Sequence, residues 1–220
     1  MKHEETVKAI EANKIITILR GLTEEQLIRT CEAMERGGIR LAEVTFSATG
    51  EPSDEVIAGY IRTLAAHFAG SMHIGAGTVL TERQVRLAAE AGAEFIISPD
   101  TNADVIRATR EAGLVSIPGA FTPSEATAAH RAGADFIKLF PNSEVKISYL
   151  KALAVPLSHI RFLAVGGVND GNLPDYLAAG AKGVGIATGI VNKKLIAAGD
   201  YDAITALAAR YTESAGGGKS

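Results

Sequence analysis

The sequence lacks several features that would assign it to large classes of protein. Its 220 residues contain no tryptophan and a single cysteine, Cys31. One thiol cannot form an internal disulfide, and the helical spacing of apolar residues around Cys31 predicts a buried hydrophobic side chain rather than a nucleophile. No apolar run approaches the ~18 residues that are needed to span a bilayer. We therefore expect no membrane segment.

An excess of positive charge is also missing. The formal net charge is −3, and no basic stripe with interleaved aromatic residues occurs, which argues against a nucleic-acid partner. Residues 1–10 lack the apolar core and cleavage site of a secretory signal, so we expect a cytoplasmic protein. No HExxH motif occurs, and the histidines are scattered, so we expect no metal centre. They are His3, His67, His73, His130 and His159.

What the sequence does contain is a regular alternation of short β-rich runs with longer helical runs. Eight strand candidates can be counted, from KIITILR near the start to GVGIATG near the end. Such alternation is typical of a parallel sheet, and eight units in a chain of this length predict a single-domain α/β protein, a (β/α)8 TIM barrel. We expect an N-terminal helix over residues 1–13 that covers the lower opening, the barrel over 14–214, and a flexible tail over 215–220.

A short phrase recurs where helices end and strands begin: EAGAEFI, EAGLVSI, RAGADFI and AAGAKGVGI. Glycine suits the left-handed position after a helix, so these glycines are predicted to be structural caps at the bottom of the barrel. They are Gly92, Gly113, Gly133 and Gly180. The segments after each strand then lie at the opposite end, where TIM barrels place their chemistry.

Three of the charged residues at or within predicted strands are candidates for chemistry. Lys138 interrupts the apolar run FIKLFP, and a buried ammonium must reach solvent, pair with an acid, or be held neutral as a Schiff-base nucleophile. Glu43, in LAEVTF, is either the ion-pair partner of Lys138 or a proton shuttle. Arg20, in ILRG, can offer a bidentate fork to a carboxylate or begin a surface loop.

These side chains converge at the mouth of the predicted barrel, together with other strand-end residues. A carboxylate, a guanidinium, a hydroxyl and an amine around one mouth suit an α-keto acid substrate and proton transfer on it. Glycines in GAGT (75–78), AVGG (164–167) and GVGIATG (183–189) are expected to let backbone N–H groups approach a ligand. The last two loops predict a phosphate cup. The strand-end set is Arg20, Glu43, Thr78, Pro99, Lys138 and Phe140.

Seven segments in this order, ILRG, LAEVTF, IGAGTVLT, FIISPD, IPGAFTPSEA, FIKLFP and FLAVGGV, resemble the 2-keto-3-deoxy-6-phosphogluconate / 4-hydroxy-2-oxoglutarate aldolase family. The similarity runs from about Ile15 to Tyr211. It implies a class I aldolase that needs no metal or other cofactor, acts on a small keto acid, and is usually a homotrimer of barrels.

The resemblance also implies roles for individual residues. Lys138 matches the Schiff-base lysine, and Glu43 matches the general acid/base. Arg20 and Thr78 match the residues that bind the pyruvyl carboxylate region of the substrate. Pro99 and Phe140 match the residues that form the walls of the site. The distal phosphate is expected at Gly166, Gly167, Ala187 and Thr188.

Two positions depart from the phosphogluconate-specific pattern. Ser47 stands where many such members carry an arginine, and Val165 replaces a hydroxyl that could contact the substrate chain. Both departures, with ILRG, resemble the galactonate-type branch. One lost hydrogen bond can change discrimination between C4 epimers, so the preferred epimer stays open.

The expected reaction is cleavage of a 2-keto-3-deoxy-6-phospho sugar acid of the phosphogluconate type to pyruvate and glyceraldehyde 3-phosphate. The alternatives within this chemistry are the phosphogalactonate epimer and 4-hydroxy-2-oxoglutarate, which needs no phosphate site. A phosphosugar isomerase or epimerase would use Glu43 as base without an imine. A regulatory barrel without turnover is disfavoured by the complete lysine, glutamate and arginine set.

Overall fold

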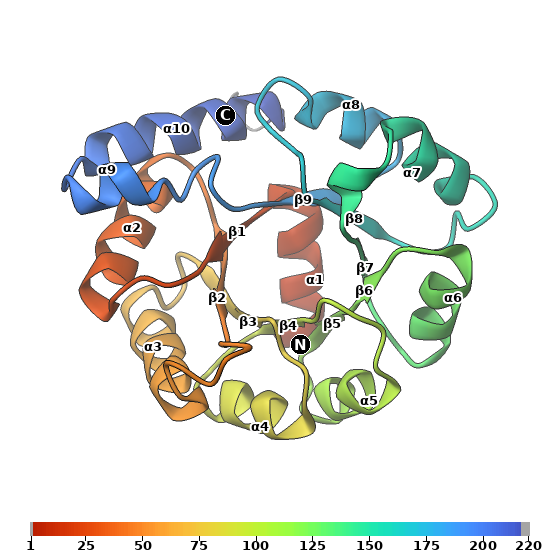
Figure 1. Cartoon of the computed structure of the whole chain (residues 1–220), viewed down its shortest axis with the longest axis horizontal. Coiled ribbons are helices and arrows are strands. Elements are labelled where there is room, and N and C mark those ends of the chain that lie inside the picture. The colour runs from red at the N-terminus through yellow and green to blue at the C-terminus, as the bar shows by residue number, and fades with distance from the viewer. Residues whose placement is uncertain (1, 217–220) are drawn as a thin grey trace.

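Nine parallel strands form the inner ring of the chain in the computed structural model, which describes residues 2–216. Helices lie between most of the successive strands and form an outer ring, as Figure 1 shows. The predicted (β/α)8 TIM barrel is therefore confirmed. The strands are β1 (Ile15–Leu19), β2 (Leu41–Thr45), β3 (His73–Gly77), β4 (Phe95–Ile97), β5 (Val115–Ile117), β6 (Gly119–Ala120), β7 (Ile137–Leu139), β8 (Phe162–Val165) and β9 (Gly183–Ile186).

The ninth strand arises because the fifth predicted strand is divided at Pro118. Proline has no N–H to donate to a ladder, so the pairing changes sides there. β5 pairs with β4, whereas β6 pairs with β7. The sheet order is β5-β4-β3-β2-β1-β9-β8-β7-β6, so this one bent segment supplies both ends of the sheet. Across the junction, the backbone N–H of Phe136 donates to the carbonyl of Ser116 at 3.2 Å.

Many of the helices begin at side-chain caps and end next to a glycine. Gly92, Gly113, Gly133 and Gly180 all have positive φ, which confirms the predicted caps. No helix in residues 2–216 is long and apolar enough to cross a membrane. The helices are α1 (Lys2–Asn13), α2 (Glu24–Arg36), α3 (Asp54–His67), α4 (Glu82–Glu90), α5 (Ala103–Glu111), α6 (Pro123–Arg131), α7 (Ile147–Ala154), α8 (Leu173–Ala178), α9 (Lys193–Ala197) and α10 (Tyr201–Ser214), with a 3-10 turn at Asn142–Glu144.

Helix α1 closes the lower end of the barrel. Ile10 is fully buried in an apolar cluster that includes Phe95 and Phe136, and Val7 packs against the same cluster. Figure 1 accordingly shows α1 in the middle of the ring. Of the segment expected to be a flexible tail, residues 217–220 lie outside the described range. Ala215, by contrast, is buried, and its carbonyl accepts a hydrogen bond from Lys14 Nζ at 3.1 Å.

Cys31 lies on α2 and is fully buried in the main hydrophobic core. Burial raises the pKa of its thiol far above the usual range, and the nearby carboxylates of Glu32 and Glu35 raise it further. The thiolate form is therefore strongly disfavoured. The prediction of a structural cysteine is confirmed.

Candidate active site

A cavity of about 550 Å³ opens at the mouth of the barrel, where the strands end. All of the predicted site residues line it, although they lie on or after seven strands that are spread along the chain. They are Arg20, Glu43, Thr78, Pro99, Lys138, Phe140, Val165, Gly166, Gly167, Ala187 and Thr188. The barrel therefore brings the whole predicted set together at one site.

Lys138 and Glu43 reach the floor of this cavity from opposite sides of the barrel, β7 and β2. Both side chains also line a small apolar space beneath it, among Ile18, Ile117 and Leu163. None of the salt bridges within residues 2–216 joins the two. In the same part of the chain, Glu43 Oε2 is buried without a hydrogen-bond partner. The described residues therefore do not contain an ion pair between Glu43 and Lys138, which was one of the two roles considered for Glu43.

Burial shifts the pKa values of both groups towards their neutral forms. Glu43 is 2% exposed, and burial raises its pKa from 4.5 to about 7 against the opposing effects of Lys138 and Arg20. Lys138 is 8% exposed, and burial lowers its pKa, an effect that Glu43 opposes and Arg20 reinforces. Its Nζ lies 4.5 Å from the centre of the Phe140 ring. An amine whose neutral form is favoured by burial and a carboxyl with a pKa of about 7 suit nucleophilic attack and proton transfer.

Gly77 makes room for Glu43, a function that sequence reasoning missed. A Cβ at Gly77 would lie 2.5 Å from the carboxyl carbon of Glu43, and a Cβ at Gly75 would collide with the ring of Phe95. The glycines of GAGT thus accommodate neighbouring side chains, which differs from the expected approach of their backbone to a ligand. The signal was present in the sequence as glycines at alternate positions of one strand.

Arg20 and Thr78 meet at the rim of the cavity, where Arg20 Nη2 donates to Thr78 Oγ1 at 3.0 Å. Thr78 has a φ of 57°, a left-handed conformation that costs a β-branched residue about 1–3 kcal/mol. Such strain persists only where the surroundings hold the backbone. The Thr78 hydroxyl is therefore held in place by its loop as well as by Arg20.

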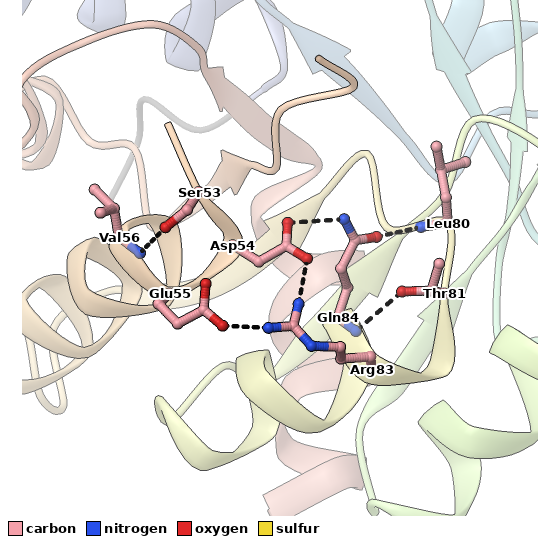
Figure 2. A network of polar contacts seen from close by, with 8 residues as sticks. All are labelled: Ser53, Asp54, Glu55, Val56, Leu80, Thr81, Arg83 and Gln84. Carbon is pink, nitrogen blue, oxygen red and sulfur yellow. Dashed lines mark hydrogen bonds and ion pairs between the residues drawn. The ribbon is translucent and has the colours of Figure 1, made fainter. Parts of the chain in front are cut away.

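A polar network fixes the loop that carries Thr78 (Figure 2). The backbone N–H of Leu80 donates to Gln84 Oε1 at 2.8 Å, and Gln84 Nε2 donates to Asp54 Oδ1 at 3.1 Å. Arg83 binds Asp54 at 2.7 Å and also contacts Glu55. The β3–α4 loop is in this way bound to the start of α3, which leaves Thr78 little freedom to relax.

The distal end of the cavity is formed by the loops after β8 and β9. Gly166 and Gly167 have φ values of 106° and 73°, which only glycine adopts readily. The buried side chain of Asn142 donates from Nδ2 to the carbonyl of Gly166 at 3.0 Å and so orients this loop. Sequence reasoning missed Asn142, whose signal was a polar residue directly after FIKLFP.

Two further residues refine the site. Ser47 does not line the active cavity but a second cavity of about 290 Å³, which shares Arg20 and Thr78 with the first. Its Oγ donates to the carbonyl of Glu51 at 2.8 Å.

Lys193, at the start of α9, lines the active cavity and was also missed by sequence reasoning. It gave no sequence signal because it lies in a polar segment beyond the predicted cup.

Within the described residues, no group of three or more histidine, cysteine, aspartate or glutamate side chains could hold a metal ion. The charged groups that line the active cavity are instead Arg20, Glu43, Lys138 and Lys193.

Comparisons with known proteins agree with this geometry. The family profile described as "Aldolase: KDPG and KHG aldolase" matches residues 6–207. The chain is 36% identical over 198 residues, 89% of its length and 90% of the relative's, to a probable 2-dehydro-3-deoxy-6-phosphogalactonate aldolase of Rhizobium meliloti. It is 35% identical over 194 residues, 87% of each chain, to the KHG/KDPG aldolase of Escherichia coli. The structure of a KDPG aldolase from Legionella pneumophila, with pyruvate captured as a covalent carbinolamine intermediate, has a TM-score of 0.82 and 28% identity over 92% of this chain and 96% of that one.

Proposed function

The chain belongs to the KDPG and KHG aldolase family of carbon–carbon lyases, and on that premise we propose that it is a class I aldolase that forms a Schiff base through Lys138. Its proposed substrate is a 2-keto-3-deoxy-6-phospho sugar acid, which it cleaves to pyruvate and glyceraldehyde 3-phosphate. The observation that carries this proposal is the lysine itself. Lys138 is almost fully buried at the floor of the cavity, and burial lowers its pKa.

The proposed reaction begins when neutral Lys138 Nζ attacks the C2 ketone. The carbinolamine loses water to give an iminium ion, which can accept electrons from the bond between C3 and C4. The Glu43 carboxylate takes the proton of the C4 hydroxyl, the C3–C4 bond breaks, and the aldehyde leaves. Glu43 then returns the proton to C3 of the enamine, and water hydrolyses the resulting iminium to pyruvate. A carboxyl with a pKa of about 7 suits both the base and the acid step.

The remaining groups bind the two ends of the substrate. The Arg20 guanidinium, with the Thr78 hydroxyl beside it, is proposed to hold the carboxylate next to C2. Pro99 and Phe140 are the proposed walls around the reacting carbons. The distal phosphate is assigned to the backbone around Gly166, Gly167, Ala187 and Thr188. Binding energy at the phosphate then contributes to positioning C2 over Lys138.

The proposal covers both C4 epimers, with the phosphogluconate type as the first expectation. Val165 lines the cavity without a hydroxyl, and Ser47 lies outside the cavity, so neither offers a hydrogen bond to the substrate chain there. Because both positions resemble the galactonate-type branch, the phosphogalactonate epimer is the second candidate. Comparing kcat/KM for both epimers and for 4-hydroxy-2-oxoglutarate ranks the three substrates.

Trapping with borohydride tests the imine directly. The protein is incubated with pyruvate and borohydride, and any irreversible adduct is located by peptide mass spectrometry. We expect an adduct on Lys138, and none in Lys138→Met. The control is Lys182→Ala, which removes an exposed lysine at the opposite end of the barrel and should leave the adduct unchanged. If folded wild-type protein yields no adduct, the aldolase mechanism is wrong and the isomerase or epimerase reading takes its place.

We also propose that the protein is a cytoplasmic homotrimer that uses no cofactor. Support for the trimer comes from the family resemblance alone. Light scattering on the purified protein gives the mass of the assembly and checks this part of the proposal.

A further inference from the structure

Lys193 extends into the active cavity from a firmly anchored backbone. The Ala187 carbonyl accepts hydrogen bonds from the N–H groups of Ile190, at 3.2 Å, and Val191, at 2.9 Å. The side chain of Asn192 then caps α9 by accepting from the N–H of Lys194 at 3.0 Å. These hydrogen bonds connect the backbone on either side of Lys193 to the loop after β9 and to the cap of α9.

The direction of the Lys193 side chain follows from its place in the helix. Lys193 is the first residue of α9 and lines the cavity at the mouth, and helical side chains lean towards the N-terminal end of their helix. A Cβ at Gly21 would lie 3.0 Å from Lys193 Nζ, so the amine reaches across to the β1–α2 loop beside Arg20. Gly21 leaves the space in which the amine lies.

The charges that line the cavity are unevenly distributed. Glu43 and Lys138 lie at the floor, and Arg20 is proposed to hold the substrate carboxylate. Among the lining residues of the described chain, Lys193 is therefore the cation to which no other role is assigned. None of the salt bridges within residues 2–216 includes it. An unpaired ammonium that lines the same cavity as the loops after β8 and β9 favours a dianion there.

We propose that Lys193 is a specificity-determining residue that pairs with the distal phosphate of the substrate and gives the site its preference for phosphorylated keto acids. This inference rests on the proposed function and deepens it. Backbone N–H groups at Gly166, Gly167, Ala187 and Thr188 form the cup, and the Lys193 ammonium closes over it as a side-chain counter-ion. An exposed lysine can do this without an energetic cost in the empty site, because its charge stays in water until the phosphate arrives.

The test measures phosphate binding apart from turnover. Glycerol 3-phosphate, an unreactive three-carbon phosphate monoester, is titrated by calorimetry into wild type, Lys193→Met and Lys194→Met. Methionine keeps the apolar stem and removes the charge. Lys194 is the neighbouring exposed lysine, and it does not line the cavity, so it is the matched control. We expect Lys193→Met to bind about three- to tenfold more weakly and with a smaller salt dependence, whereas Lys194→Met stays within about twofold of wild type.

The second measurement compares kcat/KM for the phosphorylated sugar acid and its dephosphorylated form. Lys193→Met should lower the ratio of the two values by the same factor and leave the value for the dephosphorylated substrate unchanged. Wild-type affinity of Lys193→Met for glycerol 3-phosphate overturns the inference, and so does a lack of binding by wild type at millimolar concentrations. Trapping of pyruvate on Lys138 needs no phosphate, so failure of the aldolase proposal is seen separately.

Discussion

At the scale of single residues, Glu43 links the chemistry of the site to the stability of the fold. Burial raises its pKa to about 7, so between pH 4.5 and about 7 the folded chain binds more protons than the unfolded chain. The free energy of unfolding therefore falls as pH rises through this window. Glutamine cannot ionise, so we expect the unfolding free energy of Glu43→Gln to rise by ~3 kcal/mol relative to that of wild type between about pH 4 and pH 8. Urea unfolding at the two pH values measures this gain.

Glu125→Gln is the matched control because the shift there has the opposite sign. Backbone N–H groups of Phe121 and Thr122 donate to the Glu125 carboxylate and lower its pKa. The stabilisation that the Glu125 carboxylate contributes is present above the pKa of the unfolded chain and is lost as pH falls. The unfolding free energy of Glu125→Gln should therefore fall relative to that of wild type as pH rises. If the difference between Glu43→Gln and wild type is the same at both pH values, the raised pKa of Glu43 is contradicted.

Sequence reasoning could locate Lys138 and Glu43 because each is a charged residue in an apolar strand. It could not assign Gly77, since that role depends on which neighbouring side chain fills the space beside a glycine. Glu43 pairs in register with Gly75, yet its carboxyl group occupies the space at Gly77. Lys193 was missed for a related reason. An exposed lysine in a polar segment is unremarkable until the fold shows that it lines the cavity.

At the scale of elements, two glycines test how backbone conformation alone contributes to stability. Neither Gly59, within α3, nor Gly113, after α5, has an atom within 4 Å of the position of an added Cβ. Gly113 has a φ of 73°, whereas Gly59 is helical. We expect Gly59→Ala to stabilise the protein by about 0.5–1 kcal/mol and Gly113→Ala to destabilise it by about 1 kcal/mol. Thermal unfolding compares the two, and a change of the same sign in both would contradict this account.

The elements themselves were largely predictable because helix caps and apolar alternation are local signals. Thr23 and Thr122, for example, each begin a helix with a capping box that can be found in the sequence. The division of the fifth predicted strand at Pro118 was not foreseen. A proline between two apolar residues shows that a ladder bond is missing, but which neighbour each half pairs with depends on closure of the whole ring.

At the scale of the whole molecule, the barrel separates stability from chemistry. The proposed site lies at the mouth, and α1 closes the opposite end through an apolar cluster around Ile10. Alternation of strands and helices was enough to predict this polarity, because parallel strands place all of their C-terminal ends on one side. The exact partners of α1 were not predictable, since they come from strands throughout the chain.

This separation predicts that the lower end can be weakened without altering substrate binding. Ile10 is fully buried, so Ile10→Ala leaves a cavity and should cost about 2–5 kcal/mol of unfolding free energy. Its KM should match wild type at a temperature where both proteins are folded, because no residue of α1 lines the active cavity. Lys8→Ala, at an exposed position of the same helix, is the control and should change stability by less than about 0.5 kcal/mol. Urea unfolding and steady-state kinetics measure the two properties, and a changed KM in folded Ile10→Ala would show that the two ends of the barrel are coupled.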